Sequence, residues 1–142
     1  MRNIDNNFVA MGLDFGEKRI GVSVSQLEGK IALPHSIITY KKIEIAFKEI
    51  SQIISDSKIN LIVLGLPLTM RNEIGHKAKE VLEFKNWIEK RINVEIVLED
   101  ERLSTKQAKQ AISKNSKNKF VDDSSATIIL NSFLEKRLIS NE

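Results

Sequence analysis

The stretch from Val9 to Ser25, VAMGLDFGEKRIGVSVS, constrains the fold of this chain more than any other. It begins with an apolar run that suits a buried strand, and this run stops at Asp14, which Phe15 and Gly16 follow. Gly16 opens a tight turn, and the alternation from Arg19 to Ser25 is typical of a returning strand. The stretch therefore predicts a β-hairpin with a carboxylate at the end of its first strand. An Asp in such a place is also a common turn former, so this pattern alone leaves its function open.

Size and composition indicate an ordinary globular protein. The chain has 142 residues, of which 42% are hydrophobic and 29% are charged, which argues against a disordered or a membrane protein. It contains no cysteine, which excludes disulfides, thiolate metal sites and cysteine nucleophiles and suits a reducing compartment. The N-terminus has no apolar signal segment. We expect a single cytoplasmic domain over residues 1–142, with residues 1–7 as a flexible extension and no contact with a membrane.

Hydrophobic periodicity predicts strands and helices that alternate after the hairpin. Lys30 to Tyr40 suits a third strand in which Pro34 lies at an edge or a bulge. Helical spacing marks Ile43 to about Ser57, and the short apolar run from Leu61 to Gly65 is typical of a parallel strand buried on both faces. The remaining predicted elements are a helix through Ala78 and Ile92, a strand from Val94 to Leu98, a helix capped by Ser104 or Thr105, and a last helix preceded by Asp122 or Asp123. This order predicts an α/β fold with helices on the faces of a mixed sheet.

Acidic residues lie at the ends of three predicted elements. Asp14 ends the first strand, Asp100 and Glu101 follow the last strand, and Asp122 or Asp123 precedes the last helix. Like ends of parallel strands meet at one edge of a sheet, so these acids can converge. Clustered carboxylates repel one another unless a cation neutralises them, and an oxygen-only ligand set favours Mg²⁺ or Mn²⁺. Two such ions about 4 Å apart support phosphodiester hydrolysis. Each acid also has a structural role open to it, in a turn, a helix cap or an ion pair.

The distribution of positive charge is more informative than its sum. A net charge of +3 does not by itself identify a nucleic-acid-binding protein. Between Ser104 and Phe120 the chain has no acidic residue and five lysines, namely Lys106, Lys109, Lys114, Lys117 and Lys119. Such a run beside a carboxylate cluster suits contacts with a phosphate backbone, and a solvated helix face is the alternative interpretation.

Four motifs carry a resemblance to a known family. They are GLDFGEKRIGVSVS, VLGLPLTM, EDERLST and VDDSSATIIL, and their order and spacing are typical of the YqgF/RuvX family. The chain resembles this family from Phe8 to about Leu138. Its members are bacterial proteins with an RNase H-like fold, described as Holliday-junction resolvases and as the nuclease that matures the 5′ end of pre-16S rRNA. The resemblance implies a five-stranded mixed sheet flanked by helices and a divalent-metal site.

The resemblance also implies roles for individual residues. It assigns catalysis to Asp14, Glu101 and Asp122, and it assigns the metal, Mg²⁺ or Mn²⁺, to Asp14, Asp100, Glu101 and Asp122, with Glu101 preferred to Asp100. We expect substrate contacts from basic and hydroxyl side chains in or near the motifs, namely Lys18, Arg19, Arg102, Thr105, Lys114, Lys117 and Lys119. The chain departs from the family after GLPL, where Arg71, Asn72 and Glu73 replace the usual acidic turn.

The expected function is a metal-dependent nuclease that acts on structured nucleic acid. Processing of the 5′ end of pre-16S rRNA is the main expectation, and cutting of four-way DNA junctions is the alternative. A resolvase works most simply as a two-fold dimer, and the sequence leaves monomer and homodimer open. Two other classes remain open. One is a non-catalytic nucleic-acid-binding domain of the same fold, and the other is a phosphotransferase similar to sugar kinases, which need two such lobes where this chain has one.

Overall fold

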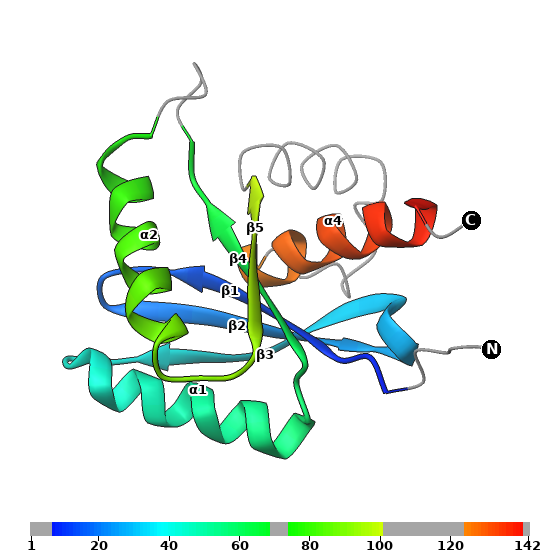
Figure 1. Ribbon diagram of the computed structural model, residues 1–142, viewed down its shortest axis with the longest axis horizontal. Coiled ribbons are helices and arrows are strands. Elements are labelled where there is room, and N and C mark those ends of the chain that lie inside the picture. Colours follow the sequence, from blue (N-terminus) through cyan, green and yellow to red (C-terminus); the bar gives the residue numbers. More distant parts are fainter. Residues whose placement is uncertain (1–6, 69–73, 101–123, 141–142) are drawn as a thin grey trace.

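The computed structural model describes residues 7–68, 74–100 and 124–140 (Figure 1). Its first part contains three strands, β1 (Ala10–Phe15), β2 (Arg19–Gln26) and β3 (Ile31–Thr39), with a short 3₁₀ turn, Leu27–Gly29, between the last two. The elements that follow are α1 (Ile43–Ser57), β4 (Leu61–Leu66), α2 (His76–Glu89), β5 (Glu95–Asp100) and α4 (Ser125–Ser140). The expected α/β architecture is confirmed.

The five strands form one mixed sheet in the order β3-β2-β1-β4-β5. β1 pairs antiparallel with β2, and β2 pairs antiparallel with β3. β4 runs parallel to both β1 and β5, so the carboxyl ends of these three strands lie at the same edge of the sheet. The predicted meeting of like strand ends is therefore confirmed.

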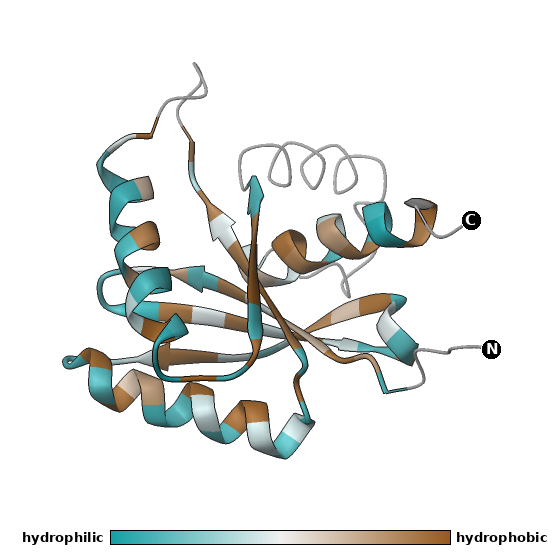
Figure 2. Ribbon diagram, in the orientation of Figure 1, coloured by the Kyte–Doolittle hydropathy of each residue, from teal (hydrophilic) through white to brown (hydrophobic). Residues whose placement is uncertain are grey.

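Helices cover both faces of the sheet, with α1 and α2 on one face and α4 on the other (Figure 1). The larger core includes Met11 and Leu13 of β1 and packs against α1 and α2, whereas the smaller core includes Ala10 and packs against Ile129 and Leu130 of α4. Successive residues of a strand point to opposite faces, which explains why neighbours in β1 belong to different cores. Apolar residues accordingly run along the central strands, while the helices alternate apolar and polar residues (Figure 2).

Most element bounds agree with the sequence pattern. The predicted helix from Ile43 to Ser57 has the bounds of α1, and Pro34 lies on the edge strand β3 beside a shift in register. β5 is longer than the apolar run that predicted it, because Glu99 and Asp100 still pair with Gly65 and Leu66 of β4. The predicted helix capped by Ser104 or Thr105 lies outside the described residues, as do residues 1–6 of the expected extension. In the described part of the chain no helix is both long and apolar enough to cross a membrane.

Candidate active site

Asp14 lies near the carboxyl end of β1, on the face of the sheet that α4 covers. Its strand partner is Gly21 of β2, and its side chain is partly buried. The turn that follows is held in place by Tyr40, whose hydroxyl donates a hydrogen bond to the carbonyl of Gly16 and whose backbone N–H donates one to Lys18. A carboxylate on a buried strand beside an anchored turn has little freedom to move. The predicted position of Asp14 at a strand end is therefore confirmed.

Two glycines allow the first turn of α4 to approach this carboxylate. A Cβ atom on Gly12 would lie 2.4 Å from Ser23 Oγ, 2.7 Å from the Ala126 carbonyl oxygen and 2.8 Å from Leu130 Cβ, so no other residue fits there without moving the helix. The Ser23 hydroxyl donates a 2.7 Å hydrogen bond to the same Ala126 carbonyl. A Cβ on Gly21 would lie 3.7 Å from Asp14 Cβ and 3.5 Å from Ala126 Cβ. A Cβ at Gly21 would therefore make only ordinary van der Waals contacts with the side chains of Asp14 and Ala126.

The N-terminal turn of α4 next to Asp14 is capped by Ser124. The Ser124 hydroxyl accepts a 3.3 Å hydrogen bond from the Thr127 N–H, and its carbonyl accepts bonds from the Thr127 and Ile128 N–H groups. The N-terminus of a helix carries partial positive charge, which favours a phosphate or a carboxylate nearby. The structure thus places a carboxylate and an anion-attracting helix end at one position of the sheet edge.

Two predicted substrate contacts, Lys18 and Arg19, lie in and directly after the turn that follows Asp14. Both side chains are exposed. Arg19, Gly21 and Ser23 are spaced two residues apart in β2, so they point to the same face of the sheet. This is also the face of Asp14. The structure therefore places Arg19 at the same end of the hairpin and on the same face as Asp14, and the phosphate-binding role of Arg19 stays a prediction.

Asp100, the second described metal-ligand candidate, lies at the same sheet edge but on the opposite face. Asp100 is four residues after Ile96 in β5, so both side chains point to the same face of the sheet. Ile96 packs into the core beneath α1 and α2. Asp100 also lies two strands away from β1, a separation of roughly 10 Å at the usual strand spacing. The described strands thus do not bring Asp14 and Asp100 together, and a ligand role for Asp100 stays a prediction.

The other predicted site residues lie outside the described residues. They are Glu101, Arg102, Thr105, Lys114, Lys117, Lys119 and Asp122.

Glu99 is a buried carboxylate to which sequence reasoning assigned no role. It is 5% exposed, lies on the α4 face of β5, and accepts hydrogen bonds from Ser132 Oγ at 2.8 Å and Lys136 Nζ at 2.6 Å. These contacts join β5 to α4. Sequence alone offers little signal for them, because the two elements are more than thirty residues apart. Glu99 therefore holds α4 against β5 in the described structure.

A second group of polar side chains, also missed from the sequence, lies on the other face of the sheet. The ligand atoms of Glu17, His76 and Glu80 all lie within 4.8 Å of one another, with His76 Nε2 at 3.8 Å from Glu80 Oε2. A hydrogen bond to the Glu17 carboxyl, burial and the charge of Glu17 raise the pKa of Glu80. Burial, followed by the charges of Glu17 and Glu80, raises the pKa of Tyr40, so its hydroxyl stays a donor to Gly16. This group could hold a cation, but it is separate from Asp14.

Sequence comparisons identify the family. A profile of the RuvX family, described as Holliday junction resolvase, matches residues 8–136. A relative from Thermoanaerobacter pseudethanolicus, named as a candidate pre-16S rRNA nuclease, is 32% identical over 89% of this chain and 96% of its own. Relatives of the same name from Sulfurihydrogenibium and from Onion yellows phytoplasma are 37% and 39% identical, and the matches cover 93% and 91% of this chain and 93% and 90% of the relatives.

Solved structures support the same fold. T. thermophilus RuvC in complex with a Holliday junction substrate superimposes with a TM-score of 0.56 at 16% identity, covering 94% of this chain and 97% of that one. Fowlpox virus resolvase with Holliday junction DNA gives a TM-score of 0.51 at 13% identity, covering 92% of this chain and 99% of that one. At these identities the likeness concerns the fold, which is RNase H-like. The sequence matches show that the chain belongs to the RuvX family and is a nuclease, an enzyme that hydrolyses phosphodiester bonds of nucleic acid.

Proposed function

We propose that this nuclease processes the 5′ end of pre-16S rRNA, with Asp14 at the centre of its active site. The observation that carries the proposal is the position of Asp14, which lies on the α4 face of the sheet beside Gly21, where the first turn of α4 also packs. Relatives at 32% to 39% identity are named for this reaction, which supports RNA as the substrate. This substrate would place the enzyme in the cytoplasm.

In the proposed site, Asp14, Glu101 and Asp122 hold Mg²⁺ or Mn²⁺. The oxygen donors of Asp14 suit a hard divalent cation, and this side chain lies beside Gly21, which adds no side chain of its own. Asp100 points to the face of the sheet opposite Asp14, which supports the choice of Glu101 as the ligand from the EDERLST motif. When bound, the divalent cation supplies the water activation and the charge neutralisation that phosphodiester hydrolysis needs.

The chain's own side chains position the nucleic acid in this proposal. Arg19 and Lys18 hold phosphate groups on the Asp14 side of the hairpin turn, and the N-terminal end of α4 offers a further site for a phosphate oxygen. Arg102 and Thr105 support the site from the DER motif, and Lys114, Lys117 and Lys119 extend the contacts along the backbone.

The test is a cleavage assay with a 5′-extended 16S rRNA precursor and a mobile four-way DNA junction, each with Mg²⁺, Mn²⁺ or EDTA. We expect metal-dependent cleavage of the precursor. Asp14→Asn should lower its rate by more than about a hundredfold, beyond the loss that an outer-shell partner of a metal causes. Asp56→Asn, which removes an exposed carboxylate of α1 on the other face, is the matched control and should cleave at the normal rate. Full activity of Asp14→Asn would remove this residue from the site.

Cleavage of four-way DNA junctions is the second candidate. It is favoured by the description of the matched family and by the fold shared with RuvC. Symmetric cutting of the junction without cutting of the precursor would reverse the ranking. Because two symmetric cuts are made most simply by a two-fold dimer, the oligomeric state in solution should be measured in the same experiment. If neither substrate is cut, both candidate substrates are wrong for this nuclease.

A further inference from the structure

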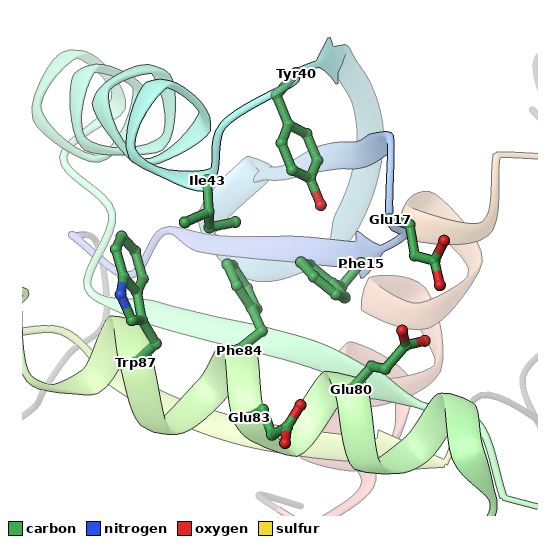
Figure 3. Close-up of a pocket in the computed structure, with 8 residues that line it drawn as sticks. All are labelled: Phe15, Glu17, Tyr40, Ile43, Glu80, Glu83, Phe84 and Trp87. Atoms are coloured by element: carbon green, nitrogen blue, oxygen red, sulfur yellow. The ribbon is translucent and has the colours of Figure 1, made fainter.

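A cavity of about 330 Å³ opens on the face of the sheet opposite α4, between the β1–β2 turn, the start of α1 and one side of α2 (Figure 3). Its volume lies within the range of small-ligand sites. It does not include Asp14, which points to the other face of β1. The proposed nuclease site therefore gives this cavity no role.

Aromatic rings form the floor and one end of this cavity. Phe15 of β1 and Phe84 of α2 stack with their ring centroids 4.4 Å apart, and Trp87 lies at the far end near Ile43 (Figure 3). The Arg91 guanidinium lies 3.9 Å from the centroid of the Trp87 ring. This indole therefore already takes part in a cation–π contact. Such a floor favours a ligand that combines apolar methylene groups with a flat cation.

The other end of the cavity carries negative charge. The carboxyl groups of Glu17 and Glu80 point toward one another within hydrogen-bonding reach, and Glu83 also lines the cavity (Figure 3). In the part of the chain that the structure describes, no lysine or arginine lines the cavity. Glu17, Glu80 and Glu83 form no ion pair with any lysine or arginine among the described residues. The cavity thus concentrates negative charge in a chain whose net charge is +3.

We propose that this cavity binds an arginine side chain of a protein partner. The methylene groups of the arginine would lie on Phe15 and Phe84, while its planar guanidinium reaches Glu17 and Glu80. A guanidinium can bond two carboxylates at once, and it relieves their mutual repulsion. Nucleic acid does not fit this description, because its phosphates would meet three carboxylates. A lone metal ion uses neither the aromatic floor nor most of the volume.

The partner's arginine would lie on the far side of the catalytic strand. Phe15 of the cavity follows Asp14 directly in β1, and Glu17 belongs to the turn that Tyr40 anchors. The two sites open on opposite faces of the sheet, so nucleic acid and the protein partner can bind at the same time. This inference does not depend on which nucleic acid the enzyme cuts.

The chain has a single tryptophan, so its fluorescence reports on this cavity directly. We would titrate the protein, free of nucleic acid, with the peptide acetyl-Gly-Arg-Gly-amide and with the same peptide carrying citrulline, which keeps the shape and loses the charge. We expect a saturable change with the arginine peptide and at least about tenfold weaker binding of the citrulline peptide, because a charged hydrogen bond is lost.

The double variant Glu17→Gln/Glu80→Gln should bind the arginine peptide at least about tenfold more weakly, because the charged hydrogen bonds are lost. Glu89→Gln, on the same helix α2, removes one exposed charge outside the cavity and should bind normally. Circular dichroism and thermal unfolding check that the double variant is folded.

Three outcomes would overturn the proposal. The first is equal binding of the two peptides, and the second is unchanged binding by the folded double variant. The third is a fluorescence response to micromolar Mn²⁺ or Zn²⁺ that His76→Ala abolishes, without any response to the peptide. That result would assign Glu17, His76 and Glu80 to a metal ion instead.

Discussion

Gly12 and Gly21 share one face of the sheet, but they differ in the space that a side chain would find. At Gly12 an added Cβ would meet atoms of Ser23, Ala126 and Leu130 at less than 3 Å. At Gly21 the nearest atoms would be at ordinary van der Waals distance, 3.5 Å or more. The first glycine therefore sets how closely α4 approaches the sheet, whereas the second leaves room for a methyl group beside Asp14.

This difference predicts that Gly12→Ala is unstable and Gly21→Ala is not. We expect Gly12→Ala to lower the free energy of unfolding by about 1–3 kcal/mol through overpacking against α4. Gly21→Ala should change it by less than about 1 kcal/mol, because alanine fits and restricts the unfolded chain. Urea denaturation of both variants measures the difference. Equal stability of the two would mean that α4 does not press on Gly12.

At the scale of elements, the position of α4 depends on contacts at both of its ends. Its first turn bonds to Ser23 of β2, and its later turns bond through Ser132 and Lys136 to Glu99 of β5. β2 and β5 lie on opposite sides of β1 in the sheet. The helix is thereby tied across the sheet, and its N-terminal end is kept beside Asp14.

Removing the charge of Lys136 alone should lower the free energy of unfolding more than removing the charges of both Lys136 and Glu99. Lys136→Met leaves the Glu99 carboxylate buried with one hydrogen-bond donor, and we expect a loss of about 1–3 kcal/mol in the free energy of unfolding. The double variant Glu99→Gln/Lys136→Met should be more stable than the sum of its single changes predicts, since no buried charge remains. A double-mutant cycle from denaturation curves measures this coupling. Strict additivity would show that the ion pair does not stabilise the helix.

At the scale of the whole molecule, the proposed nucleic-acid contacts lie toward the α4 face, where Arg19 lies with Asp14, and the acidic cavity lies on the other. The lysine run between Ser104 and Phe120 is the largest predicted source of phosphate contacts. If it binds the backbone, it releases counterions, and binding then depends on salt. The salt dependence of nucleic-acid binding therefore tests whether the lysine run contacts the phosphate backbone.

Replacing Lys114, Lys117 and Lys119 together by Gln should weaken nucleic-acid binding and flatten its salt dependence. The log–log slope should fall by about 0.7 to 0.9 for each contact that is lost. The matched control is the replacement of Lys41, Lys42 and Lys48 by Gln, which removes the same charge from exposed positions at and before α1. Binding measured by fluorescence anisotropy over a range of salt concentrations decides the matter. An unchanged slope would make the lysine run a solvated surface.

The elements and the place of Asp14 followed from the sequence because local patterns determine them. Helical spacing from Ile43 to Ser57 and the apolar run before Asp14 each lie within one element, so neighbouring residues carry the whole signal. The resemblance to the RuvX family added the fold and the activity through motifs that span nearly the whole chain. The metal ligands all stay predictions, because the structure gives only the position of Asp14 in β1, and Glu101 and Asp122 lie outside the described residues.

Only the tertiary structure decided which side chains share a face across strands and helices. Asp100 and Asp14 both end strands at one edge, but the register through β4 gives them opposite faces. The pairing of Glu99 with α4, and the meeting of Glu17 with Glu80, likewise join elements that are far apart in the chain. Such contacts depend on register and on helix position, which are set by the packing of the whole core and leave no local pattern in the sequence.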